Sequence, residues 1–489
     1  MKKGYIPKDQ RKKILLLSDD IRTQSGVGNM SREIVTHTAH RYNWINLGGA
    51  NKHPDKGKGF NLSPEVNQIT GLDDSDVRVL AVEGYGDQNT LRNVIAQEKP
   101  DAVLHFTDPR YWIWMYQMSN EIRQKCPLMF YTIWDDLPYP MWNREFYRSD
   151  DMLLCISKQT KNIVENVLRD HPKPDWAIQY IPHGIEKKDF FPVVNDFEFE
   201  AYKEMIFEDK EYDFVILFNS RNIRRKNASD IILSWRTFLD QLPVEKAKRC
   251  MLLLKTEPVF SAGTDLNAVI DSMCDPEIHK VKLIHKLMER KELNYLYNLS
   301  DCHMFMTDNE GWGLGLTESL IAGRMIIAPV QGGMQDQTRF EDENGDWINF
   351  SSEHPSNADG KYKKCGEWAM PIFPKTRSVK GSPLTPYIFA TQCSIEDAAI
   401  TLMKTYKLGR EEILRRGLKG REWAMGEEAG FTSEIMGQRF IKHIENLIEK
   451  WEPLPRFTTT KVDDSTILNN YNPNPISLTP EFIKEIQSI

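Results

Sequence analysis

The sequence lacks any long apolar run. No segment approaches the roughly 18–20 consecutive apolar residues that span a bilayer. The charged start, Met1–Lys8, is not followed by an apolar segment of the kind found in signal peptides. We therefore expect a cytoplasmic protein with no stable membrane insertion.

Cysteine is sparse and dispersed. Seven occur among the 489 residues, at positions 126, 155, 250, 274, 302, 365 and 393, and no two form a C-x-x-C pair. An odd, scattered set is typical of reduced thiols, and it argues against a disulfide framework or a cysteine-based zinc site.

An excess of positive charge is also missing. The net charge is −7, which argues against a surface tuned as a whole to polyanions, although local basic patches remain compatible with it. Hydrophobic residues make up 40% and charged residues 27%, as is usual for a soluble globular enzyme.

No D-x-D motif follows a predicted strand. The D-x-D at Asp74-Ser75-Asp76 precedes one, and we interpret it as a polar turn. We expect no metal ion and no cofactor, because a helix terminus with Arg and Lys can supply the charge that a divalent ion supplies elsewhere.

What is present is a repeated alternation of strands and helices. Amphipathic stretches such as Ser31–Tyr42 and Lys158–Leu168 separate short apolar runs. This alternation predicts a parallel sheet with helices on its faces. The predicted strands of the first half are Ile14–Leu17, Val77–Val82, Ala102–Phe106, Leu128–Ile133, Met152–Ile156 and Ala177–Ile181.

The same pattern restarts near Asp213, after a charged aromatic stretch, Asp196–Tyr212, that we interpret as a hinge region. The chain is longer than one core usually serves. We therefore predict an α/β protein of two Rossmann-like domains whose parallel sheets face each other across a cleft, with ligands at the carboxyl ends of the strands. The predicted strands of this half are Phe214–Phe218, Cys250–Leu254, Val281–Ile284, His303–Met306 and Met325–Ala328.

Changes of pattern predict the domain boundaries. We expect an N-terminal domain over residues 1–200 and a C-terminal domain over residues 210–425, with a helix near 432–450 packing back on the first domain. Residues 352–387 are rich in Pro, Gly, Ser and Lys, which predicts a long insertion or surface loop. Residues 452–489 form a tail.

The strongest chemical signal is a glycine-rich turn, Asp308–Gly323, between a predicted strand and a predicted helix. Glycines let the backbone approach a ligand closely, and the helix N-terminus offers free N–H groups and a favourable dipole to a diphosphate. Two solvated glutamates are the alternative interpretation, which the glycine-bracketed setting disfavours. The predicted ligand contacts here are Glu310, Gly313, Leu314, Thr317 and Glu318.

A basic loop follows the predicted strand Phe214–Phe218. Arg221 and Lys226 in this loop can neutralise the charge that grows on a departing diphosphate. The alternative is a solvated basic loop, which is disfavoured because the loop shares a predicted domain with the glutamate segment.

A second glycine turn, Gly26–Gly28, follows the strand Ile14–Leu17. It fits the approach of a phosphate or sugar from the N-terminal domain, so Gly26 and Gly28 are also predicted ligand contacts. Such turns are often purely structural, and no acidic residue about twenty positions on completes a dinucleotide fingerprint.

Together these segments resemble the retaining glycosyltransferases of family 4. Glu310 to Glu318 resembles that family's E-x7-E motif, and Arg221 with Lys226 resembles its Arg and Lys pair. Three further segments are similar to family motifs: Gly26–Gly28 to the N-terminal glycine loop, Ile181–Ile185 to the segment I-P-N-G-V, and Gly332-Gly333 to a later glycine pair. Together the motifs occur in the family's order over roughly residues 14–335.

The resemblance implies a GT-B fold with an acceptor-side N-terminal domain and a donor-side C-terminal domain. It implies a retaining transfer of a sugar from a nucleotide-diphosphate donor, a UDP- or GDP-sugar, to an acceptor hydroxyl. Glu318 would hold the ribose, Glu310 would touch the sugar, and Arg221 and Lys226 would contact the diphosphate. The acceptor stays open between a glycan, a small molecule and a modified base in DNA.

The sequence departs from the family at one point. Many members have a histidine where this chain has Trp134. Trp134 is followed by Asp135 and Asp136. One of these two residues either binds an acceptor hydroxyl or caps a turn. The predicted catalytic residues are Arg221, Lys226, Glu310 and Asp135.

Other interpretations remain open. A sugar-nucleotide epimerase or a phosphorylase on the same fold would share the donor site. A glycosidase with two catalytic glutamates is disfavoured because it would leave the basic loop without a role. A nucleic-acid-binding module without catalysis would use Arg224, Arg225, Lys226 and the cluster at 415–421, against the negative net charge. A transferase acting on a modified DNA base would combine both properties.

Overall fold

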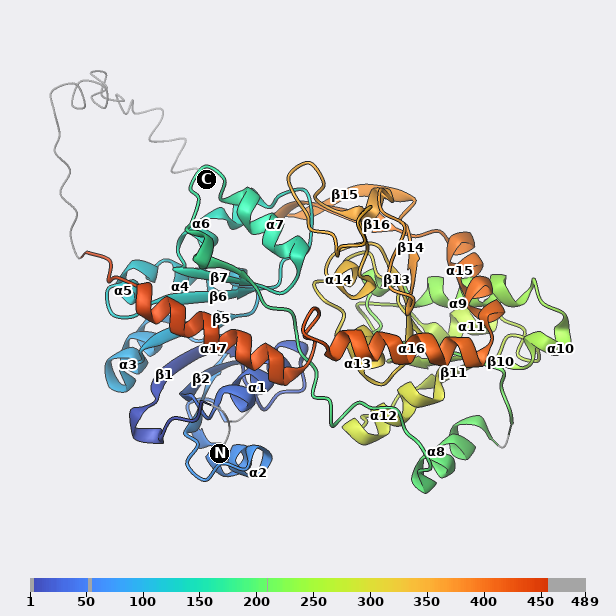
Figure 1. The fold of residues 1–489 in the computed structure, drawn as a ribbon, viewed down its shortest axis with the longest axis horizontal. Helices are drawn as coiled ribbons and strands as arrows, with labels where there is room; N and C mark the ends of the chain where they lie inside the picture. The colour runs from blue at the N-terminus through green and yellow to red at the C-terminus, as the bar shows by residue number, and fades with distance from the viewer. Residues whose placement is uncertain (1–3, 52–54, 209, 456–489) are drawn as a thin grey trace, which may run out of the picture.

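Each of the two lobes of the protein is built around a β-sheet (Figure 1). The computed structural model describes residues 4–51, 55–208 and 210–455. Most of the predicted tail, residues 456–489, lies outside the described part, as do Met1–Lys3. Within the described part, no helix combines the length and the apolar character that crossing a membrane requires.

The first lobe holds an eight-stranded sheet in the order β3-β4-β2-β1-β5-β6-β7-β8. Neighbouring strands are parallel except for β3, which pairs antiparallel with β4. The strands are β1 (Lys12–Asp19), β2 (Tyr42–Asn51), β3 (Gly59–Asn61), β4 (Val77–Glu83), β5 (Ala102–Phe106), β6 (Leu128–Thr132), β7 (Met152–Cys155) and β8 (Ile178–Tyr180).

The second lobe holds a six-stranded, fully parallel sheet in the order β11-β10-β9-β12-β13-β14. A separate antiparallel hairpin, β15–β16, is attached to it. The strands are β9 (Phe214–Asn219), β10 (Cys250–Lys255), β11 (Val281–Ile284), β12 (Cys302–Met304), β13 (Met325–Pro329), β14 (Ala369–Ile372), β15 (Thr376–Ser382) and β16 (Thr385–Gln392).

Helices cover both sheets (Figure 1). Those in the first part of the chain are α1 (Gly26–Thr38), α2 (Ser63–Thr70), α3 (Gln88–Glu98), α4 (Ile113–Tyr116), α5 (Ser119–Arg123), α6 (Arg144–Arg148) and α7 (Lys158–Val167). The later ones are α8 (Phe197–Phe207), α9 (Ala228–Leu239), α10 (Val244–Ala247), α11 (Leu266–Met273), α12 (Arg290–Leu299), α13 (Leu314–Ile321), α14 (Met334–Thr338), α15 (Ile395–Leu408), α16 (Arg410–Met425) and α17 (Ser433–Lys450).

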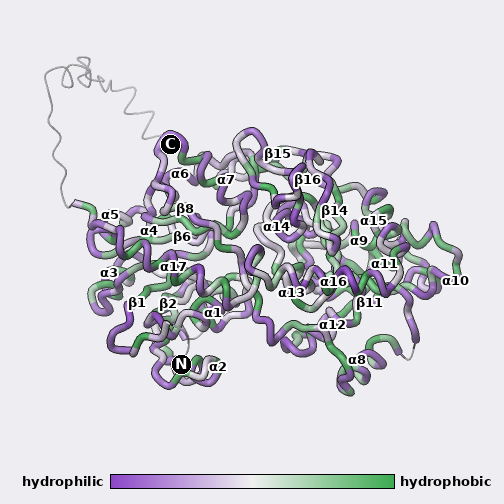
Figure 2. Tube along the Cα trace, in the orientation of Figure 1, coloured by the Kyte–Doolittle hydropathy of each residue, from purple (hydrophilic) through white to green (hydrophobic). Residues whose placement is uncertain are grey.

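The central strands form because their side chains are apolar on both faces. Ile14–Leu17 in β1 and Val215–Leu217 in β9 are fully buried. Continuous apolar runs of this kind are typical of parallel strands covered by helices on both sides. Figure 2 shows such apolar segments recurring along the strands, while the outer loops are largely hydrophilic. The two parallel sheets confirm the predicted α/β architecture of two Rossmann-like domains.

One predicted helix extends too far. The stretch Ser31–Tyr42 was expected to be helical throughout, but α1 ends at Thr38 and Tyr42 begins β2. The residues of β2 pair with β1 on one side and with β4 on the other. Burial in the middle of a sheet therefore decides the conformation of this segment, which its local pattern did not reveal.

The segment interpreted as a hinge is mostly helical. Within Asp196–Tyr212, Asp196 accepts hydrogen bonds from the backbone N–H groups of the first turn of α8, and Ile206 and Phe207 are buried. The hydroxyl of Tyr295 in α12 also donates to Asp196 at 2.7 Å. The stretch is therefore anchored to the second lobe, and the chain crosses between lobes just before it.

The predicted insertion at 352–387 contains ordered structure. It includes β14, which pairs with β13 at the edge of the second sheet, and β15 with the start of β16. The hairpin reaches the first lobe, where the backbone N–H of Phe389 donates to the carbonyl of Leu137 at 2.6 Å. The β15–β16 hairpin therefore bridges the two lobes.

A buried carboxylate also joins the lobes. Asp336 in α14 accepts a hydrogen bond from the backbone N–H of Lys158, the first residue of α7, at 3.0 Å. An anion at this position is favoured by the free N–H groups and dipole of the helix N-terminus. Burial nevertheless raises the pKa of Asp336 to about 6.

The chain returns to the first lobe through its last helices. α16 packs on α13 in the second lobe, and α17 packs on α1 in the first (Figure 1). At the junction, Ile185 forms a parallel bridge with Thr432. Gly184 lies so close to the backbone of Thr432 that an added Cβ would be 2.3 Å from the carbonyl oxygen of Thr432.

We predict that Gly184→Ala destabilises the protein by about 1–3 kcal/mol, because backbone must move to admit the methyl group. Denaturant midpoints of the variant and of wild type measure the effect. Gly59→Ala is the matched control, since its added Cβ would meet Leu80 at an ordinary 3.6 Å. Equal midpoints for Gly184→Ala and wild type would contradict the prediction.

Candidate active site

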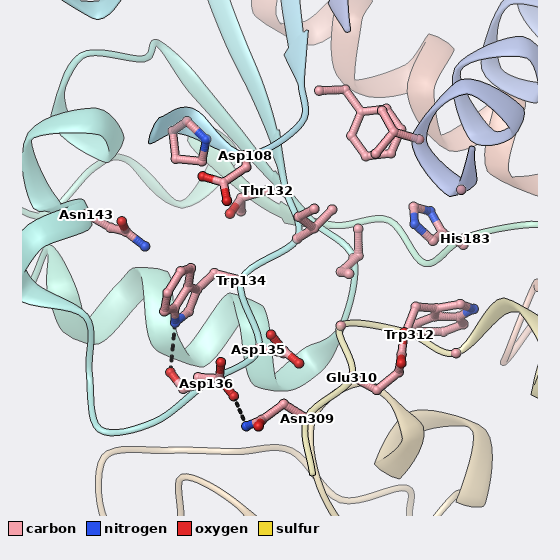
Figure 3. Close-up of a pocket in the computed structure, with 18 of the residues that line it drawn as sticks. Asp108, Thr132, Trp134, Asp135, Asp136, Asn143, His183, Asn309, Glu310 and Trp312 are labelled. Atoms are coloured by element: carbon pink, nitrogen blue, oxygen red, sulfur yellow. Dashed lines mark hydrogen bonds between the residues drawn. The ribbon is translucent and has the colours of Figure 1, made fainter. Parts of the chain in front are cut away.

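A cavity of about 440 Å³ lies between the two lobes. The first lobe lines it with loops that follow β5 and β6, and the second lobe lines it with the turn before α13. Figure 3 shows side chains from both sides converging on this space. The labelled residues are Asp108, Thr132, Trp134, Asp135, Asp136, Asn143, His183, Asn309, Glu310 and Trp312.

The turn before α13 is shaped by glycines from two segments. Gly313 precedes α13 with φ 85°, in the left-handed region that favours glycine. Gly332 and Gly333 pack against the same turn, and an added Cβ at either would be 2.1 Å from a carbonyl oxygen of Glu310 or Gly311. The turn at the carboxyl end of β12 is thus held by backbone contacts, with the N-terminus of α13 behind it.

Two of the predicted catalytic residues, Lys226 and Glu310, form a direct ion pair with each other. Arg225 lies on the other side of Glu310, with its guanidinium 3.4 Å from the same carboxylate oxygen. Lys226 is buried, and burial together with the charge of Arg225 lowers its pKa well below the ordinary value. A ligand bearing negative charge would favour the protonated lysine, so the free site is prepared for an anion.

Glu318 faces a second cavity, of about 250 Å³, whose lining also includes Leu314 and Arg290. The hydroxyl of Tyr297 donates to Glu318 at 2.7 Å. Burial raises the pKa of Glu318, while the hydrogen bond from Tyr297 and the charge of Arg290 lower it. Leu314, at the start of α13, lines both cavities, so Glu310 and Glu318 lie on opposite sides of one helix N-terminus.

The N-terminal glycine loop meets this helix from the first lobe. Gly26 lines the larger cavity, and an added Cβ there would lie 3.8 Å from Leu314. Gly28 does not line either cavity; an added Cβ would be 2.4 Å from the hydroxyl of Thr23. Ser25 accepts a hydrogen bond from the N–H of Gly28 and so caps α1. Gly26 is thus placed for ligand contact, whereas Gly28 permits the tight turn.

The first lobe lines the larger cavity with two carboxylates. Asp135 and Asp136 line the larger cavity, and burial raises the pKa of both. Asp136 accepts a hydrogen bond from Asn309 across the cavity, and the indole of Trp134 donates to the backbone carbonyl of Asp136 at 2.8 Å (Figure 3). Asp135 faces the charges of Arg225 and Lys226, which oppose the rise in its pKa without reversing it. Neither carboxylate caps α7; Ser157 does.

Three other predicted contacts, Lys226, Thr317 and Arg221, do not line either cavity, although Lys226 pairs with Glu310, which does. Thr317 is buried, and its hydroxyl accepts hydrogen bonds from Trp312 at 3.0 Å and from Gln337 at 2.7 Å. Arg221 is exposed, with its guanidinium 5.3 Å from the ring centre of Phe260. The structure therefore brings Lys226, Glu310, Asp135 and Gly26 together, with Gly313 and Leu314, and leaves Arg221 apart from them.

Several lining residues were not predicted from the sequence. His183 lines the larger cavity, and its ring contacts the hydroxyl of Tyr131 at 2.8 Å. It occupies the position where the family motif has asparagine, and this difference could have marked it as a site residue in the sequence. Burial lowers the pKa of His183 to about 3, so its imidazole is neutral. Asp108 and Arg110, after β5, also line the cavity, as does Arg225. Their position depends on the packing of the lobes.

Sequence comparisons find no relative. No protein-family model matches the chain, and no curated protein is similar to it in sequence.

The fold, in contrast, is similar to many solved structures. Sucrose-phosphate synthase from Thermosynechococcus elongatus superimposes with a TM-score of 0.61 and 14% identity, over 90% of this chain and 100% of that one. HepE from Anabaena, in complex with UDP and glucose, superimposes with a TM-score of 0.60 and 12% identity, over 89% of this chain and 100% of that one. A glycosyltransferase from Rickettsia africae has a TM-score of 0.60 and 14% identity, over 90% of this chain and 99% of that one. The chain therefore has the GT-B fold.

We predict strong coupling between Lys226 and Glu310. Lys226→Met and Glu310→Gln should each cost about 1–3 kcal/mol of unfolding free energy, because each removes the ion pair and the second also leaves the buried Lys226 without its charged partner. The double variant should lose less than the sum of the single losses. Urea denaturation of the four proteins measures this coupling, and additive losses would show that the two side chains are independent.

Proposed function

We propose that this chain is a glycosyltransferase that moves a sugar from a nucleotide-diphosphate donor to an acceptor hydroxyl, with retention at the anomeric carbon and without a metal ion. The observation that carries the proposal is the helix N-terminus of α13, with Lys226 and Glu310 on one side and Glu318 on the other. A molecule with charge in its middle and hydroxyls at both ends fits this arrangement.

The donor lies along the two cavities. The ribose meets Glu318 in the smaller cavity, the diphosphate passes the N-terminus of α13 beside Gly26, and the sugar meets Glu310 in the larger cavity. Free N–H groups and the helix dipole favour the diphosphate at this point. Arg221 joins the diphosphate contacts on the strength of the family resemblance. The HepE complex with UDP and glucose supports a UDP-sugar as the first donor to examine.

The chemistry follows from the groups around the anomeric carbon. The acceptor hydroxyl oxygen bonds to that carbon on the face from which the diphosphate oxygen departs, and the hydroxyl proton passes to a diphosphate oxygen. Lys226, Arg225 and the helix terminus stabilise the leaving charge. Asp135 and the neutral His183 lie on the acceptor side, where they orient hydroxyls by hydrogen bonding.

Calorimetric titration of the protein with UDP, GDP and ADP, and then with their sugars, tests the donor class. We expect one nucleotide to bind stoichiometrically and its sugar to be hydrolysed slowly or transferred. Failure of every nucleotide diphosphate to bind would refute the proposal.

Lys226→Ala should reduce kcat by roughly 10²–10³, the effect of removing one preorganised charge-stabilising donor. Arg221→Ala should also reduce kcat if that side chain contacts the diphosphate. Arg224→Ala, in the same loop but exposed, is the control. Wild-type turnover in the Lys226 variant would remove that residue from the mechanism.

Glu318→Ala should weaken binding of the bare nucleotide diphosphate, since a charge-assisted hydrogen bond contributes about 1.5–3 kcal/mol. Glu310→Ala should leave that affinity nearly intact and lower turnover of the full donor, because Glu310 meets only the sugar. Calorimetry with nucleotide and with nucleotide-sugar separates the two roles. Equal losses of nucleotide affinity would contradict this division.

Transfer should persist in excess EDTA, because fixed cations and a helix terminus supply the charge needed at the diphosphate. Initial rates before and after chelation provide the measurement. Loss of activity that Mn²⁺ or Mg²⁺ restores would show that the donor chemistry needs a metal ion.

A further inference from the structure

Three metal-ligating side chains, none of them assigned a donor contact, converge near the crossing between lobes, beside the smaller cavity. Glu33 and His37 lie one turn apart on the same face of α1, and Glu186 comes from the segment that follows β8. One ligand atom from each of the three lies within 4.8 Å of the others. In the described part of the chain, no other group of His, Cys, Asp and Glu side chains meets this condition.

The distances suit a single ion. The Nε2 of His37 lies 3.0 Å from the Oε2 of Glu186 and 3.6 Å from the Oε2 of Glu33. Ligand atoms bound to one tetrahedral zinc ion at about 2.0–2.1 Å are roughly 3.3 Å apart. Small rotations of the side chains would therefore place all three atoms around one centre.

The remaining carboxylate oxygens are already fixed by other groups. The Oε1 of Glu33 accepts a hydrogen bond from Arg290 at 3.0 Å, and the Oε1 of Glu186 accepts one from the backbone N–H of Lys188 at 3.2 Å. Metal-ligating carboxylates commonly have their outer oxygen held in this way. The inner oxygens are thus aimed at His37 while the outer ones are occupied.

The backbone and Cβ of His37 pack against α17. An added Cβ at Gly437 in α17 would be 2.8 Å from the Cβ of His37, so the two helices touch at this point. The amino group of Lys188 lies 3.7 Å from Glu186, but this side chain is 65% exposed and can turn into solvent. A cation can therefore enter without unpacking the helices.

The cluster is accessible to an ion. His37 and Glu186 line a cavity of about 670 Å³, and Glu33 and Glu186 line the smaller cavity that Glu318 faces. The inner oxygens of Glu33 and Glu186 both converge on the Nε2 of His37, and a single N–H can bond only one of them well.

We propose that Glu33, His37 and Glu186 bind one divalent ion of the Zn²⁺ class, with the fourth coordination position open to the adjoining cavity. A mixed set of imidazole and carboxylate ligands suits zinc and similar borderline ions better than Mg²⁺. The ion ties α1 to the segment that leads into the second lobe, beside Arg290 of α12. Its role is to fix the relative position of these elements, away from Lys226 and Glu310.

The full chain, stripped with EDTA and then freed of chelator, is titrated with ZnCl₂ by calorimetry, with MgCl₂ in parallel. We expect one Zn²⁺ per chain, a higher melting temperature with Zn²⁺, and no saturable Mg²⁺ binding at this site. His37→Ala, Glu33→Gln and Glu186→Gln should each lower Zn²⁺ affinity by more than about 100-fold, since even an outer partner is worth 10–100-fold.

His279→Ala is the matched control, because His279 contacts the single carboxylate of Asp240 at 2.9 Å and should leave Zn²⁺ binding unchanged. The two Gln variants keep side-chain size, so the comparison survives if His37→Ala fails to fold. Zn²⁺ binding that none of the cluster variants weakens, or no stoichiometric binding, overturns the proposal. No nucleotide is present in these titrations, so their outcome is independent of the proposed transfer reaction.

Discussion

The ion pair of the buried Lys226 and the partly buried Glu310 lies where both lobes meet, and the arrangement around it depends on keeping these charges close. Lys226 follows β9 and Glu310 follows β12, two strands that are neighbours in the second sheet. Their carboxyl ends meet at one edge, which brings two segments more than eighty residues apart in the chain into contact. Burial makes an unpaired charge costly here, so a negatively charged ligand can replace Glu310 as the partner of Lys226.

Backbone contacts, more than side chains, hold the turn that presents this pair. Gly332 and Gly333 approach the carbonyl oxygens of Glu310 and Gly311, and Gly313 supplies the left-handed conformation before α13. The first lobe then closes the site with Gly26 and with a loop that contacts the β15–β16 hairpin. The fixed backbone and the buried charge of Lys226 give the helix N-terminus a defined position relative to Asp135 and Asp136, which is what charge stabilisation without solvent rearrangement requires.

The fold was largely predictable because its strands are continuous apolar runs. The predicted strands at Ala102–Phe106 and Val281–Ile284 coincide with β5 and β11. The segment at β2 was missed because its conformation depends on pairing with β1 and β4, and the interlobe hairpin was missed because β15 is exposed and has no apolar pattern. The GT-B fold is confirmed by structures only 12–14% identical in sequence.

By itself, the sequence determined the two-domain α/β architecture, the glycine turn before α13 and the chemical nature of Glu310, Glu318 and Lys226, because strand periodicity and residue type are local properties. Tertiary structure alone decided which side chains share a cavity. It placed His183, Asp108 and Arg225 in the cavity that Glu310 lines, left Arg221 exposed, and brought Glu186 to Glu33 and His37 across about 150 residues. Such contacts depend on how strand ends and helix faces pack together, and no local pattern in the chain encodes that packing.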